Sequence, residues 1–179
     1  MKEGNKMVKS IYCVDKISGS PKGIAVAENN NTPAKRMNIV SIKMVREATM
    51  LYDIRKITSP TDAVEIGKRF LEDSDREQLL VCCLDTKNQP VALNVVSVGS
   101  INSSIVHPRE VFKAAILSNA ASIILYHNHP SGDPTPSKED INITNRLKEC
   151  GKLMGVELID HIIIGSDGNY CSLKEISKM

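Results

Sequence analysis

The sequence predicts an α+β or mixed α/β fold, because segments with helical and strand patterns follow one another without an internal repeat. From residue 60 onward the expected order is helix, strand hairpin, helix, strand, helix and two strands. Hydrophobic residues form 41% and charged residues 25% of the 179 residues, which excludes the disordered and fibrous classes. This length allows one ordinary domain with roughly 50 residues to spare.

The first 56 residues differ in character from the rest of the chain. They carry 11 Lys and Arg against 5 Asp and Glu, a net charge of +6, whereas residues 57–179 carry 12 against 16, a net charge of −4. We therefore predict a boundary near Ile57, with a basic N-terminal segment at residues 1–56 and a domain at residues 57–179. Short strands are expected in the basic segment at 11–14, 24–27 and 38–45.

The domain is expected to begin with a helix at residues 60–71, for which Ser59 is the N-cap and Pro60 suits the first helical position. Its buried face is predicted from the apolar residues Ala63, Ile66 and Phe70. Strand patterns follow at 77–84 and 91–98. Because a short turn joins these strands, we expect them to pair antiparallel.

A second helix is expected from Pro108 to about Asn119, with an apolar side formed by Val111, Phe112, Ala115 and Ile116. A strand at 121–126 follows and delivers two histidines at its end. Ser137 then caps a third helix, which Gly155 ends and whose apolar stripe comprises Ile143, Leu147, Cys150 and Met154. Strands at 156–164 and 170–173 complete the domain.

The most informative segment runs from His127 to Asp140 and has the sequence HNHPSGDPTPSKED. His127 and His129 lie two residues apart on extended backbone, so both imidazoles point to the same face. Asp140 approaches from the first turn of the next helix. Two histidine nitrogens and one carboxylate oxygen, at about 2.0 to 2.2 Å from zinc, leave a fourth tetrahedral position for water, as in catalytic sites. We predict one Zn²⁺ ion held by these three residues.

Ser137 has two interpretations. Together with Asp140 it forms the S-x-x-D pattern of an N-cap with its capping box, which requires no metal. The same hydroxyl, placed near a metal, could also donate a hydrogen bond to a developing oxyanion. Both interpretations stay open on the sequence.

The H-x-H-P motif followed by S-x-x-D, with ten residues between His129 and Asp140, resembles the JAMM metalloproteases, also called MPN+ or JAB. The flanking segments 107–112 and 158–161 resemble the RadC branch of that superfamily. The resemblance covers about Thr58 to the C-terminus. It implies a JAB/MPN-like mixed sheet flanked by helices, one zinc ion, and hydrolysis of an amide or isopeptide bond by metal-activated water.

The family's functional residues map onto single positions of this chain. The metal ligands correspond to His127, His129 and Asp140, and the serine that assists the oxyanion corresponds to Ser137. The catalytic glutamate stands at the start of a hydrophobic strand, the place of Glu77. As the general base it is preferred to Glu110, for which the helix dipole offers a structural explanation.

Two neighbouring residues of the strand at 156–164 also bear on the site. Asp160 and His161 point to opposite faces, so at most one of them can face the metal site, where its side chain could hydrogen-bond a metal ligand. Because every proposed ligand lies beyond Ile57, residues 1–56 are expected to be dispensable for the metal site.

The expected partner is a protein or peptide-like substrate. An alternative function is that of a RadC-type DNA-associated protein in which the metal domain is structural or an interaction module. RadC proteins commonly carry a helix-hairpin-helix region upstream, a pattern that residues 1–56 lack, although their positive charge permits salt-sensitive phosphate contact. No run approaches the roughly 20 apolar residues of a membrane span. The polar opening and five cysteines without CxxC spacing indicate a cytoplasmic protein with reduced thiols.

Overall fold

The computed structural model describes residues 37–71, 74–99 and 106–179. All helices and strands of these described parts belong to the unit Ser41–Met179. In chain order they are α1 (Pro60–Leu71), β1 (Gln78–Leu84), β2 (Pro90–Val98), α2 (Pro108–Leu117), β3 (Ser122–Asn128), α3 (Lys138–Met154), β4 (Glu157–Ile164) and β5 (Tyr170–Ser172). The predicted α+β class and the order of its elements are confirmed.

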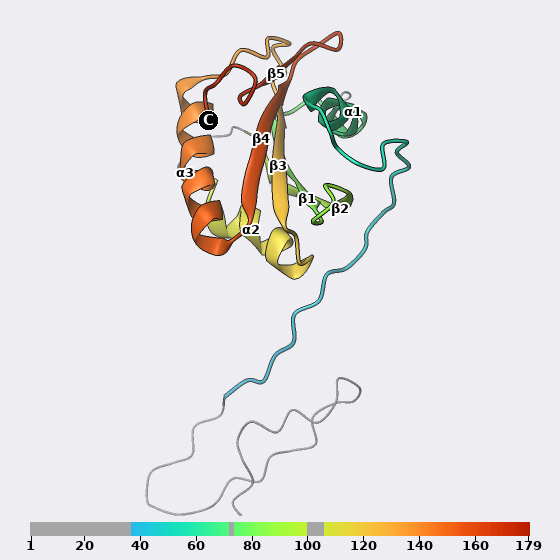
Figure 1. Cartoon of the computed structure of the whole chain (residues 1–179), viewed down its shortest axis with the longest axis vertical. Helices are drawn as coiled ribbons and strands as arrows, with labels where there is room; N and C mark the ends of the chain where they lie inside the picture. The colour runs from blue at the N-terminus through green and yellow to red at the C-terminus, as the bar shows by residue number, and fades with distance from the viewer. Residues whose placement is uncertain (1–36, 72–73, 100–105) are drawn as a thin grey trace, which may run out of the picture. The chain divides into compact units, whose positions relative to one another are not determined.

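The strands form one mixed sheet in the order β2-β1-β3-β4-β5. β1 pairs antiparallel with both β2 and β3, which confirms the predicted hairpin. β3 and β4 are parallel, and α3 is the crossover connection that parallel strands require. The sheet therefore places the end of β3 next to the start of β1 and leads the chain directly from β3 into α3 (Figure 1).

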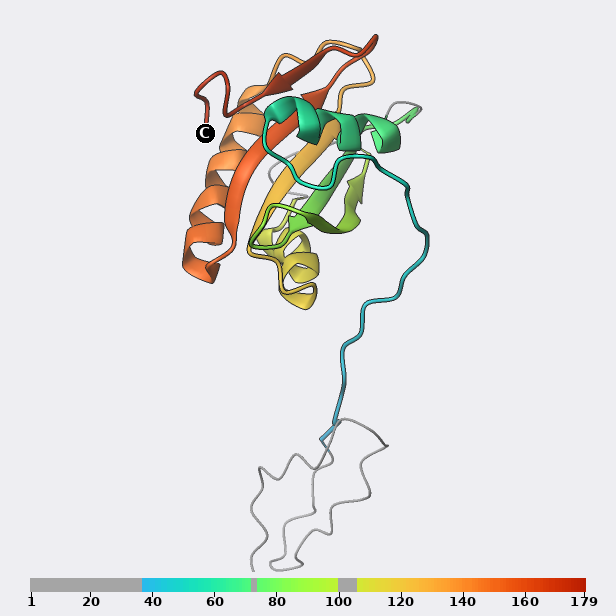
Figure 2. The same ribbon diagram turned by 45° about the vertical axis from the view of Figure 1, so that its right-hand side comes forward.

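Helices cover both faces of the sheet. α1 packs on β3 and β4, whereas α3 packs on β4 and α2 packs on β1 and β2 from the other side. Figure 2 shows α1 lying across the strands, with α2 and α3 behind them. We call these sides the α1 face and the α2–α3 face. Along β1 the buried residues alternate, so that Leu80 and Cys82 join the core on the α1 face and Leu79 and Val81 join the other core.

A β-bulge in β4 changes which residues meet each face. Ile123 pairs with Leu158 but Ile124 pairs with Asp160, so Ile159 is an extra residue in β4. Bulges of this kind redirect the side chains that follow them. As a result, Asp160 lies on the α1 face and His161 on the α2–α3 face, the side on which His127 emerges.

The helix ends follow the predicted caps. The Asp62 carboxylate accepts hydrogen bonds from the backbone nitrogens of Thr58 and Ser59, at 2.8 and 3.0 Å, at the start of α1. Ser137 caps α3 with a complete capping box, and Gly155 ends that helix in the left-handed conformation, with φ at 69°. Among the described helices, none is both long and apolar enough to cross a bilayer.

Several local predictions are wrong. Residues 38–45 form no strand and are exposed, because no described strand pairs with them and Ile39 and Val40 interrupt the alternation. Three residues predicted on buried helix faces are instead exposed, and each lies in the last turn of its helix: Phe70 (41%), Ile116 (58%) and Met154 (44%). The predicted strands at 11–14 and 24–27 lie outside the described residues, and the boundary at Ile57 stays a prediction.

Candidate metal centre

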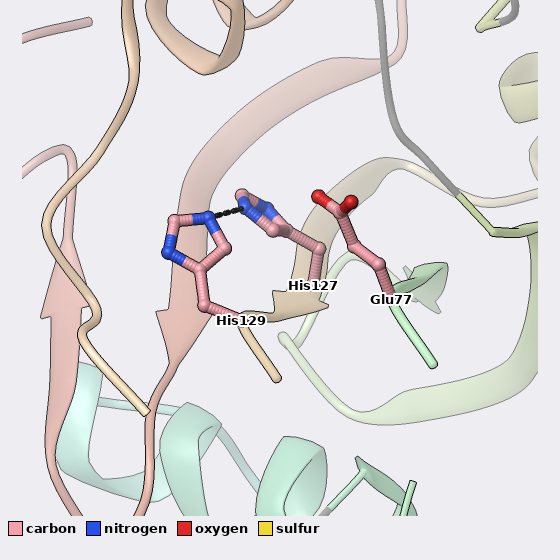
Figure 3. Close-up of side chains that lie close together, drawn as sticks. All are labelled: Glu77, His127 and His129. Carbon is pink, nitrogen blue, oxygen red and sulfur yellow. Dashed lines mark hydrogen bonds between the residues drawn. The ribbon is translucent and has the colours of Figure 1, made fainter. Parts of the chain in front are cut away.

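The two motif histidines lie at the end of β3. His127 is the penultimate residue of β3. The backbone nitrogen of His129 donates to the carbonyl oxygen of Ile164 at 2.9 Å, so the chain stays hydrogen-bonded to the end of β4 beyond β3. The Nε2 atoms of the two imidazoles are 2.9 Å apart (Figure 3). The His127 side chain is completely buried, whereas that of His129 is 17% exposed. One histidine therefore forms the floor of the site and the other its rim.

Asp140 approaches the same nitrogens from the first turn of α3. Its Oδ1 lies 3.5 Å from His127 Nε2 and its Oδ2 lies 3.6 Å from His129 Nε2. A tetrahedral zinc ion with bonds of about 2.0 to 2.2 Å has ligand-to-ligand distances of roughly 3.3 to 3.6 Å. The two distances to Asp140 fall in this range but join different oxygens of its carboxylate, and the histidine pair is a few tenths of an ångström closer than the range. The two histidines and one Asp140 oxygen therefore surround a space that a zinc ion could occupy after small side-chain adjustments.

The direction of one hydrogen bond shows how His129 could bind a cation. His129 Nδ1 lies 2.7 Å from the backbone oxygen of Asp133. A carbonyl can only accept, so Nδ1 carries a hydrogen and a neutral His129 presents a lone pair at Nε2. At 2.9 Å this lone pair faces either a hydrogen on His127 Nε2 or a cation held between the two rings.

The charges around the site follow from burial and contact. Burial, and then the neighbouring His161, hold the pKa of His127 well below its usual value. The Asp140 carboxylate, 3.6 Å away, raises the pKa of His129. For Asp140, burial works to raise the pKa, but the adjacent His129 and His127 rings and the hydrogen bonds from Ser137 outweigh it and lower the pKa. Metals bind the carboxylate and the neutral imidazole, so Asp140 and His127 are in the binding form, whereas a protonated His129 would lose its proton on binding.

Glu77 immediately precedes β1 and reaches the same site. Leu79 pairs with His127, so the antiparallel register continues to place Glu77 opposite His129 on the α2–α3 face. The carboxylate of Glu77 and one nitrogen of each histidine lie within 4.8 Å of one another, and Figure 3 shows the carboxylate directed toward His127. These three residues could themselves hold a metal ion, so Glu77 and Asp140 compete for the role of third ligand.

Asn128, between the two histidines, holds Glu77 in place. Its Oδ1 accepts from the backbone nitrogen of Gln78 at 2.8 Å, and its Nδ2 donates to the backbone oxygen of Arg76 at 2.9 Å. The side-chain amide therefore brackets Glu77 and ties it to the strand that carries the histidines. Sequence reasoning missed this residue. A polar amide between two expected ligands at a strand end is the pattern that could have indicated it.

A second layer of polar residues lies beneath His127. His127 Nδ1 is 2.8 Å from His161 Nε2, and His161 Nδ1 is 2.6 Å from Thr144 Oγ1. Burial lowers the pKa of His161 to about 4. The sequence left open whether Asp160 or His161 faces the site, and the structure places His161 there. Thr144 was missed, although it lies one helical turn after Asp140 on the same helix face.

The remaining predicted residues lie at different distances from this cluster. Ser137 is exposed, and its hydroxyl donates to Asp140 Oδ2 at 2.7 Å while accepting from the Asp140 backbone nitrogen at 3.1 Å. Glu110 pairs instead with Lys113 at 2.6 Å on the surface of α2, and this contact lowers its pKa. Within the described parts of the chain, the group of metal-capable side chains that includes both histidines contains Glu77 and neither Asp140 nor Glu110.

Comparisons with known proteins agree with this architecture. Residues 57–178 match a family model described as the RadC-like JAB domain. The chain is similar to a UPF0758 protein of Clostridium acetobutylicum, with 61% identity over 120 residues that cover 67% of this chain and 52% of that protein.

Other relatives give the same picture. UPF0758 proteins of Clostridium tetani and Methanosarcina barkeri are 58% and 52% identical over 119 and 121 residues. These matches cover 66% and 68% of this chain and 52% of each relative. The chain spans about half the length of the curated relatives it matches.

Proposed function

The chain belongs to the RadC-like JAB domain family, and we propose that it is a zinc-dependent hydrolase that cleaves an amide or isopeptide bond in a protein or peptide-like substrate. The observation that carries the proposal is the convergence of His127, His129 and Asp140, whose facing donor atoms are 2.9 to 3.6 Å apart. Glu77 stands beside them as a carboxylate that the capping box of α3 does not engage.

The ligand set divides into a buried and an accessible part. His127, His129 and Asp140 would hold the zinc ion, which when bound supplies a Lewis acid for the scissile carbonyl and makes a water molecule easier to deprotonate. His127 and Asp140 are buried, whereas His129 and Glu77 are partly exposed and Ser137 is exposed. A substrate therefore approaches from the side of these last three residues.

Glu77 is assigned as the general base. Its carboxylate takes a proton from the attacking water as the new carbon–oxygen bond forms. When the carbon–nitrogen bond breaks, the same group returns the proton to the leaving amine. Asp140 is unsuited to this task because its oxygens face the histidines and accept the capping bonds of Ser137.

Ser137 is assigned to the substrate oxygen. In the structure its hydroxyl hydrogen points to Asp140, whereas its oxygen accepts the capping bond from the Asp140 backbone nitrogen. Rotation about the carbon–oxygen bond redirects the hydrogen and leaves that capping bond intact. The serine can therefore donate to a developing oxyanion without unwinding the start of α3.

The experiment compares zinc-loaded full chains on a mixed library of peptides and of lysine peptides acylated at Nζ, with release of free amine as the readout. Glu77→Gln keeps the shape but removes the base, so we expect it to keep zinc and lose about 100-fold or more of the rate. Glu139→Gln, an exposed neighbour of Asp140, is the matched control and should keep the parent rate.

Full activity of the Glu77→Gln chain would overturn the assignment of the base, and Glu110→Gln would then be tested. Absence of amine release by the zinc-loaded parent from every substrate of the library would count against the hydrolase. DNA retention that falls with salt and survives removal of the metal would instead support the DNA-associated alternative.

A further inference from the structure

A chain of hydrogen bonds beneath the proposed metal centre joins its two ligand-bearing elements. It runs from His127 on β3 to His161 on β4 at 2.8 Å, then to the Thr144 hydroxyl on α3 at 2.6 Å. Thr144 Oγ1 in turn donates to the backbone oxygen of Asp140 at 2.5 Å. His127, His161 and Thr144 are all 0% exposed, so water does not replace any of these bonds.

The hydrogens in this chain can be assigned from its last bond. The Asp140 carbonyl can only accept, so the single hydroxyl hydrogen of Thr144 is donated to it. Toward His161 the Thr144 oxygen is then an acceptor, and His161 Nδ1 must carry a hydrogen. A neutral His161 therefore has its lone pair at Nε2, where it accepts from His127 Nδ1.

We infer that His161 and Thr144 are positioning residues that hold His127 in the tautomer with hydrogen on Nδ1, which presents the Nε2 lone pair to the metal. The inference deepens the proposed function, on which it rests, by naming residues that prepare the site. Asp140 has two roles in this arrangement. Its carboxylate faces the proposed metal position, and its backbone carbonyl fixes the direction of the hydrogen bonds that run through Thr144 and His161 to His127.

Two features of the fold supply this arrangement. The bulge at Ile159 turns His161 toward the α2–α3 face, where His127 also lies. Thr144 follows Asp140 by four residues, one turn along the same face of α3, which brings the hydroxyl within reach of both the Asp140 carbonyl and the His161 ring.

The test uses the full chain and two readouts, zinc affinity by competition with a chelator and the histidine tautomers by ¹⁵N NMR of the metal-free protein. Thr144→Val keeps the shape but cannot accept a hydrogen bond, so we expect zinc affinity to fall about 10-fold to 100-fold. Part of His127 should then carry its hydrogen on Nε2. Thr144→Ser should restore both readouts.

Ser172→Ala is the matched control, because it removes a buried hydroxyl that bonds Asp160 on the α1 face. It should change neither readout. Parent-like zinc affinity in Thr144→Val and in His161→Phe would overturn the positioning role. A parent chain without zinc affinity would refute the proposed function instead. The tautomer would still decide the inference in that case, since a His127 ring without hydrogen on Nδ1 in the metal-free parent contradicts it.

Discussion

The two faces of the central sheet are built from alternate residues of the same strands, yet they use buried carboxylates in opposite ways. Asp160 on the α1 face and Asp140 on the α2–α3 side are each only 3% exposed. The Asp160 carboxylate accepts from Ser172 Oγ at 2.6 Å and from the backbone nitrogens of His161 and Lys174 at 2.7 and 3.1 Å. Asp140 accepts from its cap but also faces two histidine nitrogens.

The pKa values separate the two carboxyl groups further. Burial raises the pKa of Asp160 in spite of its three hydrogen bonds. Burial acts in the same direction on Asp140, where the adjacent His129 and His127 rings and the hydrogen bonds from Ser137 outweigh it and lower the pKa. A buried carboxylate surrounded only by donors of its own chain is structural. A buried carboxylate that faces two imidazole nitrogens is the kind of group that the proposed zinc ion would need.

Removal of one carboxylate from each face is the strongest way to break this contrast. Asp140→Asn should lower zinc affinity at least about 100-fold, because a lost ligand costs no less than a lost supporting residue. Asp160→Asn should leave the affinity unchanged. Glu77→Gln should also bind zinc like the parent if Asp140 is the third ligand. A loss with Glu77→Gln and none with Asp140→Asn, measured by chelator competition, would reverse the roles.

The α1 face should respond to packing rather than to charge. A Cβ atom at Gly67 would lie 2.5 Å from Cδ1 of the buried Tyr126, too close for real contacts. Gly67→Val should therefore reduce the free energy of unfolding by about 3 kcal/mol, measured by urea denaturation, with zinc content per folded chain unchanged. Thr61→Val, at an exposed position of α1, should have little effect. Equal stability of the two variants would contradict the close approach.

Loss of the two Asn128 hydrogen bonds that bracket Glu77, here called the Asn128 clamp, should have an intermediate effect on stability. Asn128→Ala removes two hydrogen bonds to the backbone around Glu77 and should cost about 1 to 3 kcal/mol of unfolding free energy. The amide of Gln78 should exchange its hydrogen faster, while zinc content stays that of the parent. Asn94→Ala on β2, where the side chain is exposed, is the control. Unchanged exchange at Gln78 would rule out the clamp.

The smallest expected effect is the pH dependence that Asp160 imposes. A carboxyl group whose pKa is raised by folding contributes stability that is present below its unfolded pKa and lost as pH rises through the folded one. The free energy of unfolding of the parent should thus decline, relative to that of Asp160→Asn, as pH rises from about 4 toward 7. Urea denaturation at several pH values measures this difference. A free energy of unfolding of the parent that rises relative to that of the variant as pH rises would contradict the expectation.

The sequence was most informative where function depends on contiguous residues. The caps at Ser59, Ser137 and Gly155 depend on a few neighbouring residues, so the local sequence was enough to predict them. The predicted metal ligands lie within residues 127–140, so a short motif was enough to name them. Glu77 was assigned by resemblance and by the expectation that its strand runs in the same sheet as residues 121–126. The register between Leu79 and His127 now gives the physical reason for its place.

The features that the sequence did not reveal depend on pairing between distant segments. The bulge at Ile159 exists only in relation to β3. The bond between Asn128 and Gln78 spans 50 residues, and that between Thr144 and His161 spans 17. Residues 38–45 show the reverse. Their composition is typical of a strand, but no described strand pairs with them and they form none.

The most direct test of the account is the zinc content of the purified full chain, measured by elemental analysis beside the double variant His127→Ala, His129→Ala. The account predicts about one zinc ion per parent chain and almost none in the double variant, with circular dichroism showing both chains folded. A folded double variant that retains as much zinc as the parent would contradict the central claim that the end of β3 and the start of α3 form the metal centre.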